Sequence, residues 1–215
     1  MKKMILLSVF ALGTLTINAQ TAVVESGGFW DNWSMGIQGG ATMKMNGSGF
    51  FKSARPAFGL TIGKQWTPIL GMDIQGMGYI NTTNSSTMID ASDISLIARM
   101  NLMNLFGSYQ GMPRPFEIET VTGLGWLHHY MNGGGDTDDL SARVGLNFNF
   151  KLGADAAWTF GIKPAVVFNL TGEYPSKKMA FNKNHANMEI LLGFTYHFGD
   201  GDGNRHFAMV NAIDP

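Results

Sequence analysis

Apolar and polar residues alternate along two long segments of the chain. From Met188 to Phe198, every even-numbered residue is apolar or aromatic, and most odd-numbered residues are polar or small. From Leu140 to Leu152, the even-numbered residues are all apolar, and no odd-numbered residue is both large and apolar. Because successive side chains of a β-strand point to opposite faces, the pattern predicts two strands with one apolar and one polar face.

The same kind of segment recurs along the chain without an intervening domain boundary. We expect eight strands: Ser34–Met45, Arg55–Trp66, Ile69–Ile80, Asp93–Phe106, Phe116–Tyr130, Leu140–Leu152, Ala156–Thr171 and Asn187–Phe198. Such a series of amphipathic strands favours closure into a barrel, which leaves no unpaired edge. The sequence therefore predicts an all-β fold, an eight-stranded antiparallel up-and-down β-barrel.

The links between these segments differ in length. Links 65–68 and 153–155 are short, whereas four others are long and rich in glycine, asparagine, serine, aspartate and lysine, as loop chemistry requires. The long links are 46–54, 81–92, 131–139 and 172–186. In a meander, alternate links lie at opposite ends, so one end carries short turns and the other long loops, which is typical of transmembrane barrels. Link Gly107–Pro115 is an exception, because it is longer than its place among the short turns predicts.

The composition of the two faces predicts which face is outside. A soluble lipocalin-like barrel is an alternative with the same strand count, but its interior is apolar. Here the polar face is also rich in glycine, as a narrow interior requires, while bulky residues such as Leu60, Leu96, Leu102 and Leu146 share the other face. We therefore expect these bulky residues to face lipid. Pro164 lies on the same face inside a strand, which predicts a β-bulge.

Charged residues on the polar face are expected to lie in the lumen and to pair there. They are Asp73, Arg99, Glu117, Glu119, Arg143, Lys163 and Glu189. Asp73 is expected beside Arg99 or Asn101, and Arg99 within a diagonal of Glu119, because strands three to five are joined as hairpins. Buried charges are tolerated only when they are paired, so this composition favours a plugged lumen.

Aromatic residues provide a separate indication of a membrane boundary. If strand direction alternates, many of them collect at the end with short turns. They are Trp33, Trp66, Phe106, Phe116, Phe150, Trp158, Tyr196 and Phe198. Aromatic girdles of this kind lie at membrane–water interfaces. The alternative, in which these rings fill a soluble sandwich core, has to explain why they gather at one end.

The N-terminus resembles a secretory signal peptide. Lys2 and Lys3 precede an apolar run that ends at Ile17, and the small residue Ala19 follows. The run is shorter than the roughly 18 residues that a retained spanning helix needs. We predict a signal peptide at 1–19, a mature N-terminal segment at 20–33, the barrel at 34–198, and a polar tail or linker at 199–215. The expected location is the outer membrane.

Charge and cysteine content exclude several classes of protein. Without the two lysines of the signal, 13 basic and 16 acidic residues remain, so nothing indicates a nucleic-acid partner. The chain has no cysteine and therefore no disulfide framework. The segment Asp200–Asn204 imitates the start of a calcium loop. An EF-hand loop needs glycine at its sixth and glutamate at its twelfth position, where this chain has Arg205 and Asn211. We expect neither a cofactor nor a metal ion.

Enzymatic chemistry at the barrel rim is a weaker alternative. His128 and His129 are adjacent and point to opposite faces of a strand, so they do not share a metal ion. Either histidine could pair with Ser141 and with Asp138 or Asp139 in a nucleophile–base arrangement, as a lipid-modifying enzyme would require. The spacing is not diagnostic, and we expect the chain not to be an enzyme.

Several short motifs resemble the N-terminal barrel of OmpA-type outer-membrane proteins. They are Asn32-Trp33-Ser34 with Gly36 and Gly39-Gly40; Arg55-Pro56-Ala57 followed by Gly63-Lys64-Gln65-Trp66-Thr67-Pro68; Asn101-Leu102 with Asn104-Leu105-Phe106-Gly107; Gly123-Leu124-Gly125-Trp126; and Thr195-Tyr196-His197-Phe198-Gly199. The resemblance covers roughly Trp33 to Gly199. It implies contact with outer-membrane lipids and lipopolysaccharide, insertion by the barrel-assembly machinery, and a monomer. Members often continue into a domain that binds peptidoglycan, but residues 200–215 are too short for one, so a peptidoglycan partner requires a further C-terminal domain.

Two functions are compatible with this pattern. The first is a structural, envelope-stabilising barrel whose interior charges pair. The second is a narrow porin that passes small solutes, although open aqueous pores typically have about sixteen strands. The balance of acidic and basic residues on the polar face favours the structural role.

Overall fold

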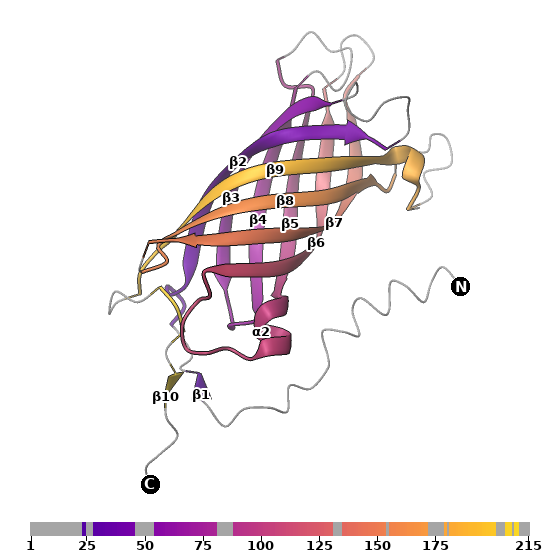
Figure 1. Ribbon diagram of the computed structural model, residues 1–215. Helices are drawn as coiled ribbons and strands as arrows, with labels where there is room; N and C mark the ends of the chain where they lie inside the picture. Colours follow the sequence, from indigo (N-terminus) through magenta and orange to yellow (C-terminus); the bar gives the residue numbers. More distant parts are fainter. Residues whose placement is uncertain are drawn as a thin grey trace, which may run out of the picture. The chain divides into compact units, whose positions relative to one another are not determined.

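The chain forms a closed antiparallel β-barrel in the computed structural model (Figure 1). The structure describes residues 23–24, 28–45, 54–80, 88–130, 135–153, 155–171, 179, 181–200, 205–207 and 209–210. Strands β2 to β9 are neighbours in chain order, and β9 pairs with β2 to close the barrel. The predicted eight-stranded up-and-down fold is confirmed. Residues 1–19 and most of the four long links lie outside the described residues, as does part of the tail.

The observed strands follow the predicted segments closely. Their bounds are β2 (Trp33–Lys44), β3 (Arg55–Gln65), β4 (Leu70–Tyr79), β5 (Ala91–Asn101), β6 (Phe116–His129), β7 (Thr137–Leu152), β8 (Trp158–Asn169) and β9 (Ala186–His197). Predicted and observed ends differ by no more than three residues, except at the end of the fourth segment. A short 3-10 helix, η2 (Lys183–His185), precedes β9. Separately, β1 (Val23–Val24) and β10 (Met209–Val210) pair in a two-stranded antiparallel sheet.

The fourth predicted strand is too long at its C-terminal end. β5 ends at Asn101, and the chain continues as a short helix, α2 (Leu102–Gly107). The Asn101 side chain caps this helix by accepting a hydrogen bond of 3.0 Å from the backbone N–H of Asn104. The prediction that Leu102 and Phe106 lie on a strand is therefore wrong. The alternation ends at Asn101, since Leu102 and Met103 are both apolar, as are Leu105 and Phe106.

The predicted β-bulge at Pro164 is also wrong. Between β7 and β8, Gly145 pairs with Ala165 and Phe148 pairs with Ile162, so two residues lie between these pairs on each strand. No extra residue is inserted, and the register is the same on both sides. Because proline has no N–H to donate, the ladder to β7 is interrupted there, whereas Pro164 pairs with Ile190 on the other side.

Side chains alternate between a polar interior and an apolar exterior. On β2, Ser34, Gln38 and Thr42 are buried inside, while Met35 and Ile37 are exposed outside. The same holds around the barrel, where large apolar side chains such as Leu60, Leu96 and Leu192 are exposed. This arrangement is the inverse of a soluble barrel. Among the residues that the structure describes, no helix is long and apolar enough to cross a membrane.

The adjacent residues Gly39 and Gly40 provide a test of how closely the strands approach. A Cβ atom at Gly40 would overlap the carbonyl oxygen of Ile190, whereas at Gly39 the nearest atom is the Ala57 oxygen at 3.8 Å. We therefore expect Gly40→Ala to cost about 1–3 kcal/mol through overpacking. Gly39→Ala should be nearly neutral. Urea titration of both variants in vesicles measures the difference, and equal losses would contradict the register of β2 and β9.

Candidate functional site

The barrel interior carries a first group of charges, the Arg99 cluster, formed by Asp73, Arg99 and Glu119 on β4, β5 and β6. Arg99 Nε lies 2.8 Å from Asp73 Oδ2, and its Nη1 lies 3.0 Å from Glu119 Oε1. The residue opposite Arg99 on β4 is Gly71, where a Cβ would lie 2.8 Å from the guanidinium. A larger residue there would displace the arginine, so the glycine makes room for the ion pairs.

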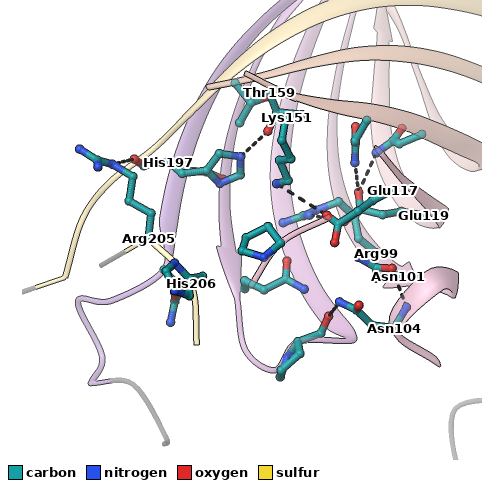
Figure 2. A pocket seen from close by; sticks show the side chains of 18 of the residues that line it. Arg99, Asn101, Asn104, Glu117, Glu119, Lys151, Thr159, His197, Arg205 and His206 are labelled. Atoms are coloured by element: carbon teal, nitrogen blue, oxygen red, sulfur yellow. Dashed lines mark hydrogen bonds and ion pairs between the residues drawn. The ribbon is translucent and has the colours of Figure 1, made fainter. Parts of the chain in front are cut away.

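Other strands add further polar contacts inside the lumen. Asn149 on β7 donates to Glu119 Oε2 at 2.8 Å. Lys151 Nζ lies 3.8 Å from Glu117 Oε2 (Figure 2). Lys163 on β8 donates to Gln38 Oε1 on β2 at 3.1 Å. Both carboxylates and both lysines therefore have polar partners from other strands.

A second group, the Arg143 cluster, consists of Tyr79, Arg143 and Glu189. Arg143 Nη1 lies 2.5 Å from Glu189 Oε2, and the Tyr79 hydroxyl donates to Glu189 Oε1 at 2.7 Å. Arg143 is 4% exposed and Glu189 is fully buried. Asp93, on β5, accepts hydrogen bonds from Ser95 and, at 2.5 Å, from Ser141. These groups come from four strands, β4, β5, β7 and β9.

Apolar side chains also point into the interior. Ile97, Val121 and Leu191 lie on the inward, mostly polar face of their strands, and all three are buried. Together with residues of both clusters, they line a cavity of about 30 Å³. A space of this size admits about two water molecules. Side chains therefore occupy most of the lumen at this level.

A larger cavity of about 100 Å³ lies at the end of the barrel that carries α2 (Figure 2). Tyr109, from the link between α2 and β6, donates its hydroxyl proton to the Phe207 carbonyl oxygen at 3.0 Å. Arg205 donates to the His197 carbonyl oxygen at 3.1 Å and pairs with Asp155 at 2.7 Å. These residues form a floor across this end of the lumen. Burial raises the pKa of Tyr109 to about 12, so its hydroxyl remains a donor at neutral pH.

The sequence offered little indication of this floor. The link that contains Tyr109 was longer than its place among the short turns predicts, and that length lets it reach across the opening. The seven predicted lumen residues all point inward from their strands, and six of them, all but Lys163, form the ion pairs described above. Asp93 and Lys151 were not among the predicted lumen charges, although both lie on the polar face of their strands.

Most of the predicted interface aromatics lie at the α2 end, on the outside of the barrel. Trp66, Phe116, Phe150, Trp158 and Phe198 are exposed, and Trp33 and Tyr196 are partly covered. Neighbouring rings contact one another, as in Phe116–Phe150 and Trp158–Tyr196, each with centroids 5.0 Å apart. Phe106 is exposed on α2 rather than on a strand.

The rim residues do not assemble into a nucleophile–base arrangement. His128 Nδ1 lies 2.7 Å from Asp138 Oδ1, and His129 Nε2 lies 3.5 Å from Asp139 Oδ2. Ser141, however, donates to Asp93 inside the barrel instead of contacting a histidine. Over the described ranges, no group of three or more histidine, aspartate or glutamate side chains could hold a metal ion.

No protein-family model and no curated protein matches the sequence. Among solved structures, the chain is similar to Neisserial surface protein A, with a TM-score of 0.55 and 11% identity, covering 77% of this chain and 97% of that one. It is also similar to the N-terminal β-barrel domain of OprF from Pseudomonas aeruginosa, with a TM-score of 0.50 and 12% identity, over the same shares of the two chains. At this identity the comparison establishes the fold. The predicted resemblance to the N-terminal barrel of OmpA-type proteins is thus confirmed at the level of fold.

Proposed function

We propose that this chain is an outer-membrane β-barrel protein with a structural, envelope-stabilising role. The observation that carries the proposal is the inverted barrel, in which an apolar exterior surrounds an interior of paired charges. An exterior of this kind is stable in lipid, where a closed barrel satisfies every backbone hydrogen bond between its strands. The aromatic residues at the α2 end then lie at a membrane–water boundary.

The packed interior favours a structural role over a porin. Arg99 and Arg143 each bind carboxylates from other strands, and the apolar residues between the clusters fill further space. The floor formed by Tyr109, Arg205 and Phe207 covers the larger cavity at one end. A solute that crossed the barrel would have to displace these contacts.

The remaining features of the proposal follow from this assignment. The N-terminal signal peptide directs export, and the barrel-assembly machinery inserts the folded strands. The partners are outer-membrane lipids and lipopolysaccharide, and the protein acts as a monomer without catalysis. Peptidoglycan becomes a partner if a further C-terminal domain follows the barrel.

Conductance of the refolded protein in a planar bilayer tests this function. A structural barrel with a packed interior is expected to give no steady current at moderate voltage. The narrow porin is the second candidate, since the cavity of about 100 Å³ at the α2 end is lined by charged residues. Sustained single-channel current that persists in repeated insertions would support the porin and contradict the structural proposal.

A further inference from the structure

Lys64 occupies an unusual position on the barrel. It lies on β3 on the same side as Ile62 and Trp66, which face outward, and it pairs with Trp33 on β2. An uncompensated lysine on the outer wall of a membrane barrel is unfavourable. Lys64 is nevertheless only 6% exposed, because the chain preceding β2 covers it.

The turn at residues 28–32 forms a cage around the ammonium group. Lys64 Nζ donates to the carbonyl oxygens of Phe29 and Asp31, each at 2.7 Å, and of Gly28 at 3.3 Å. It also lies over three rings, 5.6 Å from the centroid of Phe29, 5.5 Å from Trp33 and 5.2 Å from Trp66. Three charge-assisted hydrogen bonds and three cation–π contacts satisfy the charge without water.

The same turn is attached to the barrel at two other points. Trp33 Nε1 donates to the Phe29 carbonyl oxygen at 2.8 Å. The backbone N–H of Gln65 donates to the carbonyl oxygen of Asn32 at 3.0 Å. Asn32 has a φ of 60°, the left-handed conformation that asparagine tolerates. The turn is thus fixed against the outer wall.

The result is an exposed aromatic pair beside the wall. Phe29 and Trp30 contact each other edge to face with centroids 5.1 Å apart, and Trp30 is 80% exposed. They continue the band formed by Trp33 and Trp66 at the α2 end. Tryptophan at such a position is typical of membrane–water boundaries, where its ring is partly buried and its N–H stays hydrated.

We propose that Lys64 fastens residues 28–32 to the barrel as an aromatic foot that places Phe29 and Trp30 in the headgroup–hydrocarbon boundary of the bilayer. The partner is the lipid surface at the α2 end, since the foot is continuous with the apolar exterior. Lys64 holds the turn against the barrel wall. Its ammonium group donates all three hydrogens to carbonyl oxygens of the turn, so none is free to bind a lipid phosphate. This inference rests on the proposed membrane-spanning role.

Tryptophan fluorescence in vesicles tests the foot. The chain has five tryptophans. A variant that keeps Trp30 and Trp33, with the other three replaced by phenylalanine, preserves the hydrogen bond from Trp33 to Phe29. The difference in quenching between this variant and its Trp30→Phe derivative reports on Trp30. In vesicles with brominated phospholipids, we expect strong quenching by bromines near the headgroup and weaker quenching by bromines near the terminal methyl. Aqueous iodide should quench weakly. Lys64→Met in this background should lose most of the lipid quenching and gain iodide quenching, whereas Lys44→Met should change neither.

A second variant separates failure of the foot from failure of the membrane assignment. In a background without tryptophan, Leu96→Trp lies at the middle of β5 and should be quenched most by the deep bromines. If Leu96→Trp is quenched in this way but Trp30 is quenched only by iodide, the foot is wrong and the barrel still spans the bilayer. If Trp30 is shielded from both quenchers, protein covers it and the foot is also wrong. Loss of lipid quenching at both positions would overturn the membrane assignment itself.

Discussion

Arg99→Ala is expected to destabilise the folded barrel by about 3–5 kcal/mol, the usual consequence of removing one partner of a buried ion pair. Arg99 binds two carboxylates, Asp73 at 2.8 Å and Glu119 at 3.0 Å. Without the guanidinium, both negative charges remain in a narrow interior with little water. Glu119 keeps Asn149 as a neutral donor, whereas Asp73 loses its ionic partner.

A double-mutant cycle isolates this interaction. Asp73→Ala removes one of the stranded carboxylates, so the double variant should lose less stability than the two single losses added together, by about 0.5–3 kcal/mol. Asp155→Ala is the control, since it breaks an exposed ion pair with Arg205 and should cost about 0–1 kcal/mol. Urea titration in vesicles measures all four variants.

The same cycle distinguishes a packed lumen from a water-filled one. In an open pore, water would solvate Asp73 and Glu119, and the coupling would fall towards the roughly 0–1 kcal/mol of exposed pairs. Additive losses together with steady current through the parent protein would therefore contradict the packed interior.

The sequence predicted the barrel because its main determinant is local. Alternation with a period of two residues is visible in each strand, and the glycines on the polar face indicate a narrow interior. The hairpin connections then placed Asp73, Arg99 and Glu119 close together. Ile97, Val121 and Leu191 depart from this alternation, and the structure shows that they fill space between the two charge clusters.

The features that sequence reasoning missed depend on contacts between distant residues or on a single cap. The Tyr109–Phe207 hydrogen bond joins residues 98 positions apart, and no local pattern indicates it. The caging of Lys64 requires a turn more than thirty residues earlier to fold over the outer wall. Helix α2 is a single short segment, and its start depends on one asparagine side chain that accepts a hydrogen bond from the backbone.

Leu96→Arg is expected to cost about 2–4 kcal/mol of folding free energy in vesicles, as a charge on the lipid face near the bilayer midplane does. Leu96 is 53% exposed on the outer wall and lies at the centre of β5, which runs from Ala91 to Asn101. The arginine would have to enter hydrocarbon or deform the bilayer, because its neighbours on this face are apolar.

Leu70→Arg is the matched control, because the cost of a charge on the lipid face depends on its depth in the bilayer. Leu70 is also an exposed leucine on the outer wall, but it is the first residue of β4, at the α2 end. There the guanidinium reaches the headgroups, and the cost should fall to about 0–1 kcal/mol. Urea titration of both variants in the same vesicles gives the difference. Similar losses at the two positions, or a larger loss for Leu70→Arg, would mean that the apolar exterior is not oriented across a bilayer with Leu96 at its centre.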